Sequence, residues 1–179
     1  MRFRTTRRGI EAVVDEVETS VLRRCAQDLL VLLGDEQEPT GDPLEELLGI
    51  PGGATERPHD PALVRLLPDA YGDDDPEASA EFRRYTEGDL RAGKRAGCTT
   101  VLATLPPTEG TVRLDREQAM GWLGCLNDLR LVLGTRLGVQ DDLDPDDLEP
   151  DDPRAQPLQV YGWLGWLQES LLGCLDPRG

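Results

Sequence analysis

Hydrophobic residues recur every three or four positions along most of the chain, which is the spacing of one face of an α-helix. Strings of polar residues, glycine and proline separate these segments. The pattern predicts helices over residues 15–34, 43–48, 61–67, 77–105, 115–137 and 157–175. The segment 115–137 is apolar on nearly every side, which is typical of a helix at the centre of its domain.

Helix starts are marked by aspartates that can accept hydrogen bonds from the free backbone N–H groups of a first turn. Asp42, Asp60 and Asp75 each precede a proline, and Asp115 precedes a glutamine three residues later. We expect the helix over 77–105 to be weakened or broken near Gly97. Its inner face should carry four residues, namely Phe82, Tyr85, Leu90 and Ala96.

Short alternating segments at 2–6, 9–14 and 111–114 predict strands, the first two joined by a turn. We therefore predict a mainly α single domain over residues 1–179. It has five or six helices and a small N-terminal sheet of two or three strands. Residues 139–156 repeat aspartate, leucine and proline, which predicts an acidic proline-rich loop within the domain.

The chain has a formal net charge of −16, which argues against a dominant nucleic-acid surface. Its basic residues are almost all arginine, as in proteins from GC-rich genomes such as those of actinobacteria. No signal peptide or apolar run of about 18 residues is present, so we expect a cytoplasmic protein with no membrane contact.

Catalytic and cofactor motifs are missing from the sequence. The only histidine, His59, lies in a proline-rich segment, and no phosphate-binding glycine loop or nucleophile motif occurs. The four cysteines have no zinc-site spacing. We predict a protein that is not an enzyme and that has no metal, cofactor-binding or catalytic residues.

Polar residues inside the apolar segment 126–138 must find partners, because an unpaired buried polar group costs roughly 1–3 kcal/mol. We predict that Asn127, Asp128, Arg130 and Arg136 form a buried polar network, with Asp128 paired to an arginine such as Arg84 or Arg91. A ligand pocket at these residues is the alternative.

Three cysteines are candidate redox thiols. Cys125 and Cys174 lie on predicted core helices and could face each other, although buried inert thiols are the commoner outcome. Cys98, beside Lys94 and Arg95, is the best candidate for an exposed thiol with a lowered pKa.

A partner surface is predicted on two helices. Arg84, Arg91 and Arg95 share a stripe on the helix over 77–105, and Trp166 lies off the apolar stripe of the last helix. The alternative is a solvated or salt-bridged helix face. Arg2, Arg4, Arg7 and Arg8 form a second arginine-rich face.

Four segments, taken together, resemble one actinobacterial family of unknown function. They are Arg65–Tyr71, Ala80–Lys94, Leu126–Gly138 and Tyr161–Glu169, in this order along nearly the whole chain. The family comprises AosR-like oxidative-stress transcriptional regulators. The resemblance implies a cytoplasmic regulator of redox-responsive genes with no enzyme activity. A thiol switch is in doubt, because the cysteines of this chain stand singly.

We therefore expect a regulatory protein that acts through protein contacts in transcription, with DNA contact disfavoured by the net charge. The first alternative is a cytoplasmic adaptor or structural protein in protein turnover or sulfur metabolism. The second alternative is a small-molecule-binding helical domain. The sequence does not determine the oligomeric state.

Overall fold

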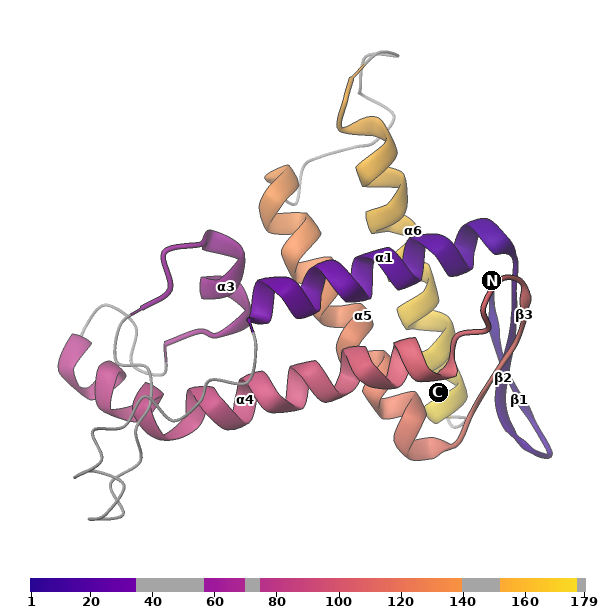
Figure 1. Cartoon of the computed structure of the whole chain (residues 1–179), viewed down its shortest axis with the longest axis horizontal. Coiled ribbons are helices and arrows are strands. Elements are labelled where there is room, and N and C mark those ends of the chain that lie inside the picture. Colours follow the sequence, from indigo (N-terminus) through magenta and orange to yellow (C-terminus); the bar gives the residue numbers. More distant parts are fainter. Residues whose placement is uncertain (35–56, 70–74, 140–151, 177–179) are drawn as a thin grey trace.

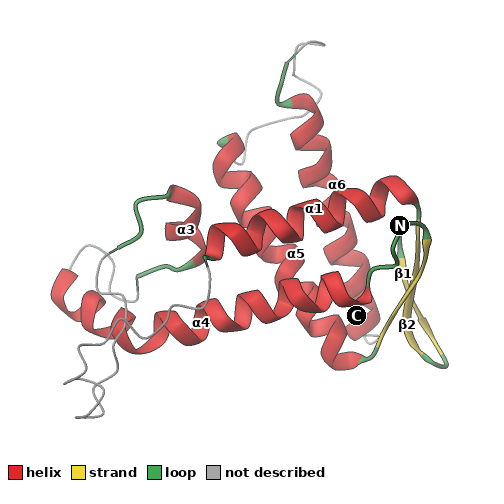
Figure 2. Cartoon of the chain, viewed as in Figure 1, coloured by secondary structure: helices red, strands yellow, loops and turns green. Residues whose placement is uncertain are grey.

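The computed structural model describes residues 1–34, 57–69, 75–139 and 152–176. These residues form a mainly helical single domain with a small three-stranded antiparallel sheet at its N-terminal end (Figures 1 and 2), which confirms the predicted fold class. The elements are β1 (Phe3–Thr6), β2 (Gly9–Val14), α1 (Glu16–Leu33), α3 (Pro61–Leu66), α4 (Pro76–Thr104), β3 (Gly110–Leu114), α5 (Arg116–Leu137) and α6 (Ala155–Leu175).

The sheet has the order β1-β2-β3, and its strands alternate between a buried and an exposed face. Arg4 lies opposite Glu11, which lies opposite Arg113 in turn, so one row of charges crosses the exposed face. The turn between β1 and β2 ends at Gly9, whose φ is 117°. A Cβ atom at this position would lie 2.6 Å from the carbonyl oxygen of Leu114, so the turn requires glycine.

Aspartates begin four of the helices, and the sequence predicts three of these starts, at Asp60, Asp75 and Asp115. Asp15 and Asp115 each form a capping box with the residue three positions later. Asp60 and Asp75 accept hydrogen bonds from backbone N–H groups of the helices that follow them. These contacts are local, which is why the helix starts could be predicted from sequence. The helix predicted over 43–48 lies outside the described residues.

Two pairs of helices cross each other (Figure 1). Helices α1 and α4 lie side by side, and α5 and α6 form a second pair that crosses them. The sheet packs at one end, where the ring of Phe3 meets that of Trp122 edge-on at 5.5 Å. Helix α5 contacts α1, α3, α4 and α6, so it occupies the central position expected for an apolar helix.

Helix α4 differs from its prediction in two ways. It is continuous from Pro76 to Thr104, with no break near Gly97. Its inner face is also not the predicted one, because Phe82, Tyr85 and Leu90 are 41–52% exposed. Polar residues are buried instead in the N-terminal half of this helix, and they are Ser79, Arg83 and Glu87.

The acidic loop predicted over residues 139–156 lies mostly outside the described residues, which stop at Val139 and resume at Asp152. Helix α6 begins at Ala155, two residues earlier than predicted from Pro157, so the predicted loop overlaps its first turn.

Candidate functional site

Helices α4 and α5 approach each other most closely where two glycines meet. A Cβ atom on Gly97 of α4 would lie 3.0 Å from the backbone oxygen of Gly121 on α5. A Cβ atom on Gly121 would lie 3.3 Å from the hydroxyl oxygen of Thr100. Real Cβ contacts are rarely this short, so the distance between the two helices depends on both glycines.

This close approach brings two thiols together. Cys98 follows Gly97 on α4, and Cys125 lies about one turn after Gly121 on α5. Their sulfur atoms are 3.7 Å apart, with the thiol of Cys125 donating to that of Cys98. Both side chains are buried, and both thiols are free. A disulfide has an S–S length of about 2.05 Å, so a small movement of the two side chains would join the sulfurs.

The two thiols differ in acidity because of their mutual hydrogen bond. The donated bond from Cys125 has the largest influence and lowers the pKa of Cys98, burial acts against it, and Arg95 lowers the pKa only slightly. The same hydrogen bond, together with burial, raises the pKa of Cys125. The carboxylate of Asp128 raises the pKa of both. Cys98 is therefore the thiol that more readily carries negative charge, and Cys125 is the one that keeps its proton.

A groove of about 500 Å³ lies beside the thiol pair. We call it the α4–α5 groove, and its lining includes Gly93, Lys94, Gly97, Gly121, Cys125 and Asp128. Lys94 donates a hydrogen bond of 2.7 Å to Asp128 within it. Cys125 therefore lines the α4–α5 groove, whereas Cys98 does not.

The four polar residues of segment 126–138 do not meet in one network. Asp128 pairs with Lys94 of α4, Arg136 pairs with Asp60 at the start of α3, and Asn127 is exposed and lines the α4–α5 groove. They separate because residues two or six positions apart point to different sides of a helix. Their partners therefore lie on different elements around α5.

Arg130 forms the third of these separate contacts. Its guanidinium donates to Gln168 at 2.8 Å and lies 5.1 Å from the ring centre of Tyr161, both on α6. Gly165 makes this contact possible, because a Cβ atom there would lie 3.3 Å from the Nε atom of Arg130. Arg130 does not line the α4–α5 groove, so the predicted ligand pocket would retain only Asn127 and Asp128.

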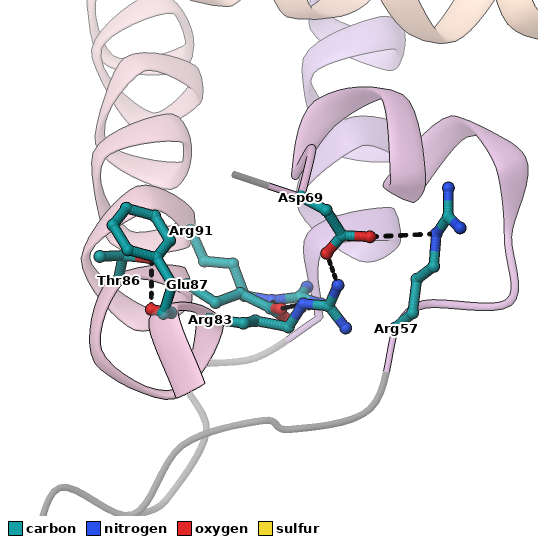
Figure 3. Close-up of polar contacts among 7 residues, drawn as sticks. Arg57, Asp69, Arg83, Thr86, Glu87 and Arg91 are labelled. Atoms are coloured by element: carbon teal, nitrogen blue, oxygen red, sulfur yellow. Dashed lines mark hydrogen bonds and ion pairs between the residues drawn. The ribbon is translucent and has the colours of Figure 1, made fainter. Parts of the chain in front are cut away.

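The arginines of α4 are engaged within the protein. Arg83 and Arg91 both contact the buried carboxylate of Glu87, and Arg83 also pairs with Asp69 (Figure 3). Arg57 lies 3.4 Å from the second oxygen of Asp69. We call these five residues the ionic layer. It connects α4 to the segments on either side of α3.

Two arginines of the predicted partner surface also cap helix α1. Arg91 donates to the carbonyl oxygen of Leu33, and Arg95 donates to those of Leu30 and Gly34. Carbonyl groups in the last turn of a helix have no partner within the helix, so these contacts satisfy them. Arg91 and Arg95 are thus held in structural contacts, whereas Trp166 is 44% exposed.

The cysteine predictions need two corrections. Cys98 is fully buried rather than exposed, and its lowered pKa comes first from Cys125, with only a small part from the basic neighbour Arg95. The thiol that Cys125 meets belongs to Cys98, whereas Cys174 of α6 lines a different groove. The sequence held no signal of this pairing, because a glycine precedes Cys98, Cys125 and Cys174 alike.

Neither a metal site nor a membrane-spanning helix occurs in the described ranges. No group of three or more histidine, cysteine, aspartate or glutamate side chains there could hold a metal ion. None of the helices in those ranges combines the length and apolarity that crossing a membrane demands.

Known proteins provide independent information about the chain. Residues 1–175 match the model of a family described as a domain of unknown function, DUF2017. An oxidative stress regulator, AosR, of Mycobacterium tuberculosis is 36% identical over 168 residues, which cover 87% of this chain and 77% of the relative. A putative oxidative stress regulator, AosR, of Mycobacterium leprae is 34% identical over 174 residues, covering 90% and 80%.

No solved structure matches the chain. The match to the family model nevertheless extends over all the elements described above, from β1 to α6, and the two mycobacterial relatives cover most of the same length. The resemblance seen in the sequence is thereby confirmed, and the chain belongs to the DUF2017 family.

Proposed function

We propose that this protein is a cytoplasmic, non-enzymatic regulator of the oxidative-stress response, and that it senses peroxide through Cys98 and Cys125. The observation that supports the proposal is the 3.7 Å distance between their sulfur atoms. The regulatory role is consistent with mycobacterial relatives that are named as oxidative stress regulators.

The chemistry assigns a separate role to each thiol. The thiolate of Cys98 attacks hydrogen peroxide, forming a sulfenic acid at Cys98 and, after a proton is taken up, one water. The thiol of Cys125 then attacks the sulfenic sulfur, which forms the S–S bond and releases a second water. Two thiols lose two electrons, and one peroxide accepts them.

Because both thiols are buried, an oxidant can reach them by one route only. Peroxide must enter through the α4–α5 groove and pass Cys125, and the two helices must separate slightly before it reaches Cys98. Closing the disulfide pulls two helices together that already touch through their glycines. Formation of the disulfide therefore changes the α4–α5 contact, and we propose that partner proteins respond to that change.

Peptide mapping tests the sensing step. Reduced protein is treated with one equivalent of hydrogen peroxide, digested without reductant and analysed by mass spectrometry. We expect a disulfide between the peptides of Cys98 and Cys125, lost in Cys98→Ser and Cys125→Ser and retained in Cys25→Ser and Cys174→Ser. A disulfide to Cys25 or Cys174, or four unmodified thiols, would show that the proposed sensor is wrong.

The regulatory step has a separate test. Reduced and oxidised protein are each used to capture partners from the native cytoplasm, with the Cys98→Ser variant as the control that peroxide cannot switch. We expect at least one protein whose capture differs between the two forms of the wild type and not between those of the variant. Identical capture in all four samples would contradict regulation through this pair.

A further inference from the structure

The N-terminal sheet is a positively charged region in a chain whose net charge is −16. Residues 1–14 contain four arginines, Arg2, Arg4, Arg7 and Arg8, and all four are exposed. Within the described part of the chain, no ion pair or hydrogen bond involves their guanidinium groups. The arginines of the ionic layer, by contrast, are all paired.

Two of these arginines border a groove of about 900 Å³ between β1 and α6. We call it the N-terminal groove, and its lining includes Arg2, Arg4, Val13, Trp166 and Glu169. Val13 is 61% exposed and Trp166 is 44% exposed. Strand alternation places Arg4 and Val13 on the outer face of the sheet, because Phe3, Ala12 and Val14 point into the core.

We propose that the N-terminal groove binds an acidic segment of a partner protein. Carboxylates of that segment pair with Arg2 and Arg4, and an aliphatic or aromatic side chain packs against Trp166 and Val13. Tryptophan and arginine are the residue types that most often dominate binding energy at interfaces. The proposal adds a partner and a surface to the regulatory role proposed above, and it does not depend on the thiol pair.

The shape and charge of the groove favour a peptide over a nucleic acid. A DNA duplex carries one charge about every 1.7 Å and therefore needs an extended positive face. Here the positive charge covers only the small sheet, and the rest of the chain is strongly acidic. An acidic peptide presents few charges and can direct an apolar side chain to the exposed tryptophan.

The first experiment selects ligands without assuming their sequence. Reduced full-length protein is immobilised and used to select from a phage-displayed library of random 12-residue peptides. We expect enriched peptides to carry several aspartates or glutamates and at least one aliphatic or aromatic residue. Enrichment of neutral or basic peptides, or no enrichment, would overturn the proposal.

The second experiment measures affinity for the best enriched acidic peptide by fluorescence anisotropy. The double variant Arg2→Gln/Arg4→Gln should bind at least tenfold more weakly, as should Trp166→Ala. The matched control, Arg24→Gln/Arg65→Gln, removes the same charge from exposed positions on α1 and α3 and should stay within twofold of wild type. Circular dichroism confirms that each variant is folded.

The remaining outcomes also decide the proposal. An equal loss in the two arginine double variants would show non-specific attraction and overturn it. Tighter binding of a 20-base-pair DNA duplex than of the acidic peptide at the same salt concentration would also overturn it. So would a dimer, measured by light scattering, that Arg2→Gln/Arg4→Gln dissociates, because the groove would then hold a second copy. A protein that binds the peptide but forms no Cys98–Cys125 disulfide would contradict only the proposed sensor.

Discussion

Two contacts of helix α4 differ in kind: the ionic layer joins buried charged groups, whereas the crossing with α5 at Gly97 and Cys98 joins backbone and sulfur. The ionic layer at Arg83 and Glu87 buries charged groups and leaves large apolar side chains exposed. The crossing at Gly97 and Cys98 holds α4 against the backbone of α5, with the ion pair between Lys94 and Asp128 beside it. The first contact depends on complete pairing of charges, and the second depends on the absence of side-chain bulk.

The difference between the ionic layer and the helix crossing explains which of the two contains reactive groups. Each charge of the ionic layer already has a partner, so this layer fixes the position of α4 and offers no reactive group. At the crossing, the glycines remove side-chain bulk and bring two thiols within 3.7 Å. We infer that one half of the helix is structural, while the other half can change its covalent state.

Truncation of Glu87 should have the largest effect. Glu87→Ala leaves Arg83 and Arg91 without their shared carboxylate, and breaking a buried ion pair costs about 3–5 kcal/mol. Urea denaturation measures this loss. Glu81→Ala, on the exposed side of the same helix, is the matched control and should change the free energy of unfolding by less than about 0.5 kcal/mol. Similar values for the two variants would show that the ionic layer contributes little.

Adding one methyl group at the crossing should have the next largest effect. Gly97→Ala places a Cβ atom 3.0 Å from the backbone oxygen of Gly121, and such overpacking costs typically about 1–3 kcal/mol. The thiols should also move apart, so that peroxide forms the disulfide more slowly. Gly88→Ala, where nothing lies within 4 Å, should instead stabilise α4 by up to about 1 kcal/mol. If Gly97→Ala were as stable as Gly88→Ala, the close approach of α4 to α5 at Gly97 and Gly121 would be contradicted.

The pH dependence of oxidation tests the thiol half of the comparison. Because the pKa of Cys98 is lowered, the rate of disulfide formation should rise at a pH below the usual thiol range. The Cys125→Ala variant removes the donated hydrogen bond, so the pKa of Cys98 should increase and its sulfenic acid should appear only at higher pH. Stopped-flow measurement of peroxide consumption gives the pH profiles of the wild type and of the Cys125→Ala variant. Cys174→Ser is the control, and a shift in its profile would contradict the assignment.

The exposed ion pair between Arg136 and Asp60 should have the smallest effect. Arg136 is about half exposed, and surface pairs contribute roughly 0–1 kcal/mol because water and salt screen them. Arg136→Ala should therefore lower the free energy of unfolding by less than about 1 kcal/mol in urea. A loss as large as that of Glu87→Ala would mean that burial does not determine how much an ion pair contributes to the free energy of unfolding.

The prediction of helix faces worked for most of α6 and failed for α4. In α6 the sequence pattern predicts an apolar face of five residues, of which Leu164, Leu167 and Leu171 are buried. The other two, Val160 and Trp163, are half-buried. In α4 the same reasoning selects Phe82 and Tyr85, which are exposed. Apolar periodicity identifies an inner face only where that face packs against other apolar residues, and the ionic layer provides charged partners instead.

The sequence by itself determined the helices, their aspartate starts, the small sheet and the family. These features depend on residues a few positions apart, or on motifs that keep their order along the chain. Only the tertiary structure decided that Cys98 meets Cys125, that Arg91 and Arg95 cap α1, and that four N-terminal arginines have no ion-pair partner among the described residues. These contacts join positions far apart in sequence, and their geometry depends on how closely whole helices pack.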